Sequence, residues 1–179
     1  MGEPFNPVEH IRSLMDWPKK GVIFRDITPL LTNAANFRQL VDLFAQRYLA
    51  AEIDVVAAID ARGFIIGAPL AYALGVACLP IRKKGKLPGA VISQSYALEY
   101  GEAELEIQAD CLFHGARVLL IDDLIATGGT LLAAAGLLRR LEAKIIEAGA
   151  IIDLPDLGGS ARLRQEGIAV HSLCAFANA

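Results

Sequence analysis

Two adjacent carboxylates and a turn of small residues follow one apolar segment of this sequence. Val118-Leu119-Leu120-Ile121 leads into Asp122-Asp123, and Thr127-Gly128-Gly129-Thr130 comes four residues later. Four consecutive apolar residues are typical of a central strand that is covered on both faces. Glycine N–H groups and threonine hydroxyls at the start of a helix suit an anion, because the first N–H groups of a helix have no partner within it. The pattern predicts a phosphate at this turn.

The acidic pair narrows the choice of ligand. Asp122 and Asp123 would repel a neighbouring phosphate unless they held something in between, such as sugar hydroxyls that donate hydrogen bonds or a hydrated Mg²⁺ ion. A ribose phosphate satisfies both halves of such a site. The structural alternative is a solvated turn followed by a simple helix cap. Two glycines inside a cap would cost chain entropy without a structural gain, which favours the functional interpretation.

Charged residues also follow two other predicted strands. Asp60-Ala61-Arg62-Gly63 follows the apolar segment 55–59, and Arg82-Lys83-Lys84 follows the segment 76–81. In open α/β sheets, ligands bind beyond the carboxyl ends of the strands. We therefore expect these loops and the acidic pair to meet at one edge of the sheet. There they would supply cations for a diphosphate and carboxylates for a sugar or a metal ion.

The rest of the chain alternates between the two kinds of secondary structure. Strands are predicted at 55–59, 76–81, 118–121, 145–152 and 169–173, and helices at 37–49, 64–74, 131–141 and near 161–165. This alternation predicts an α/β fold with a mostly parallel sheet and helices on both faces. Asn6-Pro7 is typical of a helix start and predicts a short helix with Ile11, Leu14 and Met15 on one face.

Between residues 82 and 108 the alternation stops. A polar loop rich in lysine is followed by segments 91–98 and 103–107, which predict two antiparallel strands turning at Tyr100-Gly101. An insertion of this length in a compact domain is usually a lid or a binding loop.

Composition restricts the class of protein. The 179 residues fit one α/β domain, and a net charge of −3 offers no basic surface for duplex nucleic acid. Residues 63–81 carry no charge, but Gly67, Pro69, Gly75 and Pro80 interrupt them, which favours buried core over a membrane span. Three scattered cysteines lack metal-ligand spacing and indicate a reducing compartment, and no targeting signal is found at the N-terminus, so we expect a cytoplasmic protein.

Five segments together resemble the type I phosphoribosyltransferase family, and specifically its adenine branch. They are 21–31 (GVIFRDITPLL), 60–64 (DARGF), 81–89 (IRKKGKLPG), 95–101 (SYALEYG) and the strand and turn at 118–130. Other type I members share the last segment but lack the first and the LEYG sequence. The resemblance implies a type I fold formed by residues 1–179 as one domain, with an N-terminal hood at 1–35 and a flexible lid loop and hairpin at 82–108.

The resemblance also implies an activity. It is the Mg²⁺-dependent transfer of ribose 5-phosphate from 5-phosphoribosyl 1-diphosphate to N9 of adenine, giving AMP and diphosphate in purine salvage, by a homodimer. Two alternatives remain open: a phosphoribosyltransferase for another purine base, and a non-catalytic regulator that senses a purine or phosphoribosyl diphosphate on the same fold. A dinucleotide site and a P-loop are disfavoured because neither glycine pattern is present.

Site residues follow from the resemblance one by one. The 5′-phosphate is implied to bind at Ala126, Thr127, Gly128, Gly129 and Thr130, and the ribose hydroxyls at Asp122 and Asp123. Mg²⁺ is implied to bind mainly through substrate oxygens and water, with Asp122 and Asp123 as possible further ligands. The implied diphosphate and lid residues are Arg62, Arg82, Lys83, Lys84, Lys86, Ser95 and Tyr96. The implied base-binding residues are Ile23, Phe24 and Arg25, and the implied catalytic residues are Glu99, Tyr100 and Arg62.

Several of these residues have ordinary structural interpretations when taken alone. Phe24 would be a core aromatic residue, Arg62 a surface ion-pair residue and the lysines a solvated loop. A glutamate at a hairpin tip, such as Glu99, would serve only solubility. The resemblance is what favours the functional interpretation in each case.

Overall fold

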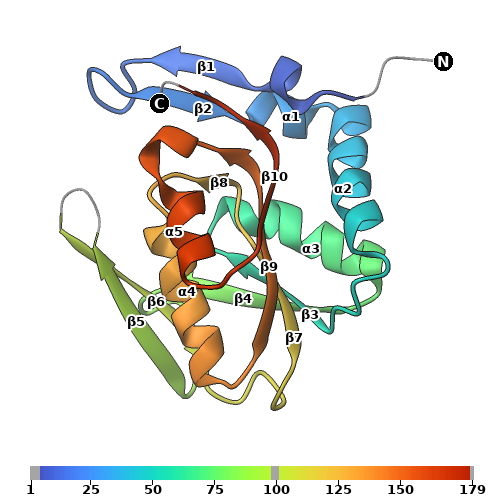
Figure 1. The fold of residues 1–179 in the computed structure, drawn as a ribbon, viewed down its shortest axis with the longest axis vertical. Coiled ribbons are helices and arrows are strands. Elements are labelled where there is room, and N and C mark those ends of the chain that lie inside the picture. The colour runs from blue at the N-terminus through green and yellow to red at the C-terminus, as the bar shows by residue number, and fades with distance from the viewer. Residues whose placement is uncertain (1–4, 98–100, 178–179) are drawn as a thin grey trace.

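A single large sheet organises the computed structural model, which describes residues 5–97 and 101–177 (Figure 1). Its strands lie in the order β10 (Val170–Ala175), β9 (Lys144–Asp153), β7 (Arg117–Ile121), β3 (Val55–Ile59), β4 (Ala77–Lys83), β6 (Glu102–Gln108) and β5 (Val91–Ala97). The short β8 (Leu124–Ile125) pairs with β9. The strands from β10 to β4 run parallel, and β6 and β5 are antiparallel to their neighbours. The predicted α/β class and the predicted mostly parallel sheet are confirmed.

Helices cover both faces of the sheet, as predicted. They are α1 (Thr28–Thr32), α2 (Ala34–Tyr48), α3 (Arg62–Leu74), α4 (Gly129–Arg140) and α5 (Gly159–Gln165), with 3-10 turns η1 (Pro7–His10) and η2 (Pro155–Leu157). Strand β7 shows how the two cores arise. Successive side chains of a strand point to opposite faces, so Val118 and Leu120 pack with α4, whereas Leu119 and Ile121 pack with α2 and α3.

The connections reverse direction at the centre of the sheet. From β3 the chain passes through α3 to β4 on one side, and from β7 it passes through α4 to β9 on the other side. Strands β3 and β7 are neighbours, with Ala58 opposite Ile121. Ligands of open α/β sheets bind in the crevice at such a reversal, beyond the carboxyl ends of the strands. The residues that follow β3 and β7 therefore form the expected site.

The N-terminal region forms a separate two-stranded sheet above this crevice. Strand β1 (Arg12–Met15) pairs antiparallel with β2 (Ile23–Asp26), and Figure 1 shows both strands lying over the large sheet. The predicted helix carrying Ile11, Leu14 and Met15 was therefore wrong after residue 10. Leu14 lies opposite Phe24, and the long-range pairing with β2 overrides the helical spacing of the apolar residues.

Asp26 fastens this two-stranded sheet to the rest of the chain. Its buried carboxylate accepts hydrogen bonds from the Arg12 guanidinium, at 2.5 and 3.2 Å, and from the Thr28 N–H group at 2.9 Å. Hydrogen bonds from Thr28, together with the Arg12 charge, lower the pKa of Asp26 to about 2. The Asp26 carboxylate thus links β1 to β2 and also accepts the N–H group of Thr28, the first residue of α1.

The segment predicted as a lid contains the hairpin of β5 and β6, paired from Val91 opposite Gln108 to Ala97 opposite Glu102. Leu98, Glu99 and Tyr100, part of the predicted turn, lie outside the described residues. The charge-free run 63–81 forms α3 and β4, as predicted. Among residues 5–97 and 101–177, no helix combines the length and apolar character that a bilayer crossing requires.

The close packing of α3 on β3 is open to test. Gly67→Ala would place a methyl carbon 2.5 Å from Cβ of Ala58, so we expect it to lower the free energy of unfolding by about 1–3 kcal/mol. Gly136→Ala on α4 is the control, because its Cβ would meet only the Gln94 side chain, at 3.5 Å. That change should be neutral or stabilising by about 0.5–1 kcal/mol. Urea unfolding measures both, and equal effects would contradict the packing described.

Candidate active site

The turn after β8 offers backbone donors at the start of α4. Gly128 precedes the helix with φ of +80°, a left-handed conformation that glycine adopts without strain. Because Gly128 has no side chain, none caps the helix, and the N–H groups of its first turn have no acceptor within the helix. Residues 122–131 and Arg62 line a cavity of about 200 Å³ at this point. The structure thus brings all five predicted phosphate residues, 126–130, to the wall of one cavity.

The two predicted ribose residues lie at the same cavity in different states. Asp123 is buried, and its carboxylate accepts a hydrogen bond from Nε of Arg62 at 2.5 Å. The Asp123 N–H group donates to Oδ1 of Asp122 at 2.9 Å. Burial and the adjacent Asp123 carboxylate raise the pKa of Asp122 well above its ordinary value. One carboxylate is therefore neutralised by a cation, while the other is held in an environment that opposes its charge.

A glycine allows α3 to approach the acidic pair this closely. A side chain at Gly63 would place its Cβ 2.9 Å from the carbonyl oxygen of Ile121 and 3.3 Å from Oδ1 of Asp122. The absence of that atom lets Arg62, the first residue of α3, reach Asp123 across the boundary between β3 and β7. Residues 60–63 thus contribute both the charge of Arg62 and, at Gly63, the space that lets α3 approach the acidic pair.

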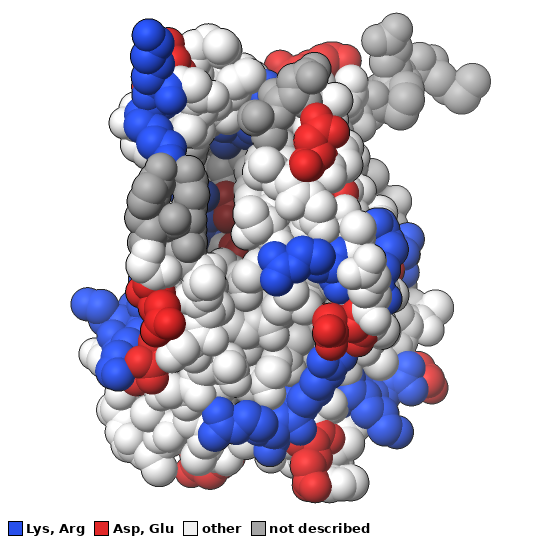
Figure 2. Space-filling view, turned by 60° about the vertical axis from the view of Figure 1, so that its left-hand side comes forward, with Lys and Arg blue, Asp and Glu red and all other residues white. Residues whose placement is uncertain are grey.

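Arg62 lines two adjoining cavities. The second, of about 290 Å³, shares Arg62, Asp122, Asp123 and Thr130 with the first. Its other walls are Asp60, Ala61, Lys83 and Tyr96. About half of the Arg62 side chain remains exposed despite the ion pair. Figure 2 shows this face of the molecule hollowed beside the β5–β6 hairpin, with acidic side chains in the hollow. The two cavities adjoin at the residues that they share.

Two of the predicted lid cations, Arg82 and Lys84, have carboxylate or backbone partners in this conformation. Arg82 donates to Asp60 at 3.2 Å and to the carbonyl oxygen of Lys86 at 3.4 Å. Lys84 forms an ion pair with Glu104 at 2.6 Å, which raises the pKa of Lys84. Lys83, by contrast, lines the second cavity.

The predicted lid dipeptide lies over the other side of the phosphate turn. Ser95 and Tyr96 line a third cavity, of about 340 Å³, together with Gly129 and Arg162. Tyr96 also lines the second cavity, so this residue borders both. A Cβ at Gly129 would lie 3.5 Å from Cδ2 of Tyr96, which places the hairpin in contact with the start of α4.

The predicted base-binding residues lie on β2, and Phe24 among them contacts a cavity residue. The Phe24 ring packs edge-on against Trp17, with centroids 4.3 Å apart, and lies 5.8 Å from Cζ of Arg62. Arg25 donates to Oγ of Ser13 at 2.5 Å and stacks on the ring of Phe176 at 4.4 Å. Ile23 lies opposite Met15 in the strand pair. The predicted catalytic residues Glu99 and Tyr100 lie outside the described residues.

Helix α5 supports the phosphate turn from behind, which the sequence interpretation missed. The N–H group of Gly159 donates to the carbonyl oxygen of Ala126 at 3.0 Å, and Nη1 of Arg162 donates to that of Thr127 at 2.7 Å. A Cβ at Gly159 would lie 2.3 Å from the carbonyl oxygen of Ala126. The one signal in the sequence is the glycine pair Gly158-Gly159 at the start of a helix, where a side chain would normally be preferred.

The fold and this site define a phosphoribosyltransferase, and comparison with known proteins agrees. The phosphoribosyl transferase domain family matches residues 27–166. Adenine phosphoribosyltransferase from Chromohalobacter salexigens is 54% identical over 166 residues, covering 93% of this chain and 92% of the relative. That from Pseudomonas paraeruginosa is 55% identical, covering 98% and 96%. This chain belongs to the adenine phosphoribosyltransferase family.

Solved structures agree with the assignment. The crystal structure of adenine phosphoribosyltransferase from Thermoanaerobacter pseudethanolicus superposes with a TM-score of 0.90 at 42% identity, covering 95% of this chain and 98% of that one. The enzyme from Saccharomyces cerevisiae, complexed with an imino-altritol bisphosphate and adenine, has a TM-score of 0.89 at 35% identity, covering 93% and 96%. The predicted type I fold is therefore confirmed.

The raised pKa of Asp122 predicts a dependence of stability on pH. The folded protein holds this proton to a higher pH than the unfolded chain does, so the contribution of Asp122 to stability falls as pH rises from about 4 through its folded pKa. Asp122→Asn removes the charge and keeps the oxygen that accepts from Asp123. We expect it to be more stable than the natural protein at pH 7.5, with a smaller difference at pH 4.5, in urea unfolding.

Asp123→Asn is the matched control, because it leaves Arg62 without its carboxylate partner. We expect Asp123→Asn to be no more stable than the natural protein at pH 7.5. An Asp122→Asn protein that is no more stable than the natural one at pH 7.5 would contradict the electrostatic account of the acidic pair.

Proposed function

We propose that this protein transfers ribose 5-phosphate from 5-phosphoribosyl 1-diphosphate to N9 of adenine, giving AMP and diphosphate. The observation that carries the proposal is the Arg62–Asp123 ion pair, which lies where a cavity at an uncapped helix start adjoins a second cavity lined by Lys83 and Asp60. The relatives named above and the adenine in the Saccharomyces cerevisiae complex support adenine as the acceptor. The AMP, diphosphate and ribose 5-phosphate in the Trypanosoma brucei complex support the ligand class.

The sugar donor would span both cavities. Its 5′-phosphate would accept hydrogen bonds from the backbone of residues 127–130, and its 2′- and 3′-hydroxyls would donate to Asp122 and Asp123. A ribose hydroxyl is a neutral donor, so it satisfies Asp122 whether or not that carboxyl carries a charge at neutral pH. The diphosphate would then lie beyond Arg62, toward Lys83.

Charge development at the leaving group determines which residues matter for the rate. As the bond between C1′ and the diphosphate oxygen breaks and the bond to N9 forms, the sugar gains oxocarbenium character and the diphosphate gains negative charge. Arg62 and Lys83 would stabilise that charge, and the two cavities would hold the reacting atoms in line. We assign the proton released from N9 to Glu99, with Tyr100 beside it, on the resemblance alone.

Mg²⁺ fits this site as an ion carried mainly by the substrate. The carboxylate of Asp123 is occupied by Arg62, and burial disfavours the charged form of Asp122. In the described part of the chain, no group of three or more His, Cys, Asp or Glu side chains is placed to hold a metal. Bound diphosphate oxygens and water would supply the remaining ligands. The ion would neutralise part of the diphosphate charge.

The hood and the lid would complete the site around the substrates. Phe24 would stack on the purine, an interaction worth about 1–3 kcal/mol for a nucleic-acid base, with Ile23 and Arg25 beside it on β2. The hood at 1–35 and the lid at 82–108 would thus act as parts of one catalytic domain comprising residues 1–179. Exposed ion pairs are individually weak, so lid cations such as Lys84 could exchange their carboxylates for diphosphate oxygens.

An exposed apolar face on α3 supports the proposed homodimer. Ile65 and Tyr72, 44% and 90% exposed, lie two helical turns apart, with the exposed Ala68 between them. A second copy of the chain would cover this face. We also propose a cytoplasmic location, because Cys78 is both exposed and free and such thiols persist in reducing compartments.

The activity test is an incubation of the protein with adenine and phosphoribosyl diphosphate, with AMP measured by chromatography. We expect AMP and diphosphate in equal amounts, loss of the reaction in EDTA and its return with Mg²⁺. The double variant Asp122→Asn/Asp123→Asn should lose at least about 10²–10³-fold in turnover while its circular dichroism spectrum stays unchanged. Near-normal turnover by that variant would refute the role of the acidic pair.

Parallel assays decide between the remaining alternatives. Hypoxanthine, guanine and xanthine should each react far more slowly than adenine, and a preference for any of them would reassign the base. Tight binding of phosphoribosyl diphosphate without turnover of any base would favour a regulator on this fold.

Tyr72→Glu tests the dimer. The change would place a charge where the proposed interface is apolar, so the dissociation constant should rise at least about tenfold, given about 1.5–3 kcal/mol for burying a large side chain. Phe113→Glu, at another exposed aromatic residue, is the control. Sedimentation equilibrium should give twice the chain mass of 19.1 kDa for the natural protein and the control. A monomeric natural protein would contradict the proposal.

A further inference from the structure

Helix α5 contributes one charged side chain to the back of the phosphate turn. Arg162 donates from Nη1 to the carbonyl oxygen of Thr127 at 2.7 Å. It also lines the third cavity, beside Tyr96 and Gly129, and not the first cavity at the phosphate turn. Arg162 therefore reaches the turn from the side opposite the proposed phosphate. We infer that Arg162 is a positioning residue for the 5′-phosphate, acting through the backbone of Thr127.

The geometry of a peptide unit explains how this works. The Thr127–Gly128 peptide is trans, so the Thr127 carbonyl and the Gly128 N–H point in opposite directions. By holding the carbonyl oxygen on the α5 side, Arg162 keeps a partial negative charge away from the anion. The same contact directs the Gly128 N–H group away from Arg162. A guanidinium suits this task because it is always charged and donates strongly to a carbonyl oxygen.

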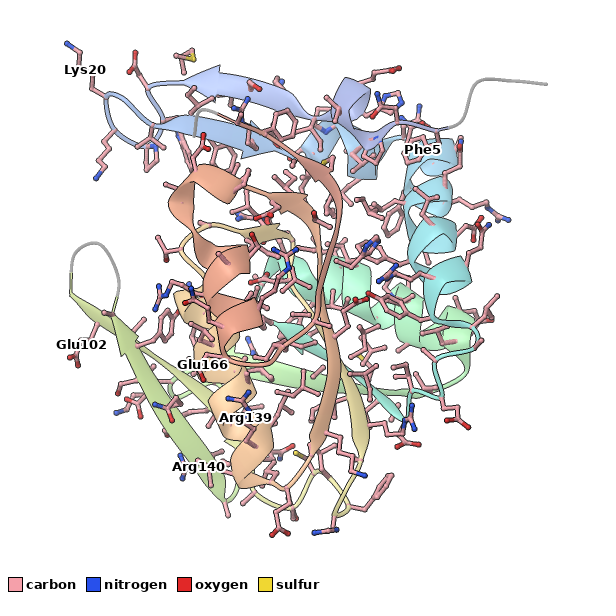
Figure 3. The ribbon with its side chains drawn as sticks, in the orientation of Figure 1. Phe5, Lys20, Glu102, Arg139, Arg140 and Glu166 are labelled. Atoms are coloured by element: carbon pink, nitrogen blue, oxygen red, sulfur yellow. The ribbon has the colours of Figure 1, made fainter. Side chains whose placement is uncertain are left out.

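Both ends of α5 are fastened, which gives Arg162 a fixed position. At the start, Gly159 packs directly on the turn and donates to the carbonyl oxygen of Ala126 at 3.0 Å. At the end, Nη2 of Arg139 donates to the carbonyl oxygen of Glu166 at 2.6 Å, and the two side chains lie 3.7 Å apart. Figure 3 shows Arg139 near the end of α4 and Glu166 at the end of α5 as neighbours. Helix α5 thus contacts the phosphate turn at its start and the end of α4 at its own end.

This inference rests on the proposed function, and it predicts an effect confined to ligands with a phosphate. Loss of the Arg162 contact frees the Thr127–Gly128 peptide to rotate. The backbone N–H groups of the turn, which bind only the 5′-phosphate of the ligand, would then be less well oriented. AMP and phosphoribosyl diphosphate should bind more weakly. Adenine and adenosine should be unaffected, because neither carries a phosphate. A general loss of structure would weaken all four ligands.

The test compares Arg162→Ala with Arg164→Ala. Both remove one positive charge from an exposed residue of the same helix. For Arg162→Ala we expect KM for phosphoribosyl diphosphate and Kd for AMP to rise about tenfold, the size expected for a charged hydrogen bond. The KM for adenine, the Kd for adenosine and the Tm should match those of Arg164→Ala. Arg162→Lys should recover most of the AMP affinity, because a single hydrogen bond to a carbonyl does not need the guanidinium fork.

Salt separates the hydrogen bond from a long-range attraction between Arg162 and the phosphate. In 1 M KCl the Debye length is about 3 Å, and the AMP affinities of the two alanine variants should still differ about tenfold. Disappearance of that difference would overturn the inference. So would equal AMP affinities in low salt, an equal loss of adenosine binding, or failure of Arg162→Lys to recover affinity. Absence of AMP formation by the natural protein would instead refute the proposed function.

Discussion

The ion pair between Arg62 and Asp123 is the contact on which the arrangement of the site depends. Arg62 begins the helix after β3, and Asp123 follows β7, so the pair joins the two strands between which the sheet reverses its order. The backbone carbonyl of Asp123 also accepts the N–H groups of Ile151 and Ile152 in β9, each at 3.1 Å. Loss of this one contact would release both the cation and the carboxylate around which the two cavities form.

The site carries charges that the fold alone does not need. Asp122 lies beside another carboxylate in a partly buried position that opposes its ionisation, and such perturbed groups are concentrated at functional sites. Of the outer cations, Lys84 has its carboxylate partner in an exposed pair, whereas the Arg82–Asp60 pair is partly buried. Exposed pairs contribute little to stability. The structure therefore combines two partly buried pairs at the site, Arg62–Asp123 and Arg82–Asp60, with one exposed and weaker pair, Lys84–Glu104.

Much of this architecture could be predicted from local patterns in the sequence. The strand at 55–59 has the predicted limits, and the apolar segment before Asp122 forms the central strand next to it. The failures involve contacts between distant residues. The spacing of Leu14 and Met15 favoured a helix, but pairing with β2 makes them part of a strand. The contacts of Arg162 with Thr127 and of Trp17 with Phe24 have no local signal, because they exist only after separate elements have packed together.

A crystal structure with AMP bound is the most direct measurement of the central claim. The account predicts the phosphate at the turn formed by residues 127–130, and the ribose hydroxyls within hydrogen-bonding distance of Asp122 and Asp123. It also predicts that the adenine ring lies under Phe24. AMP bound elsewhere, with this turn empty while the protein is saturated, would contradict it.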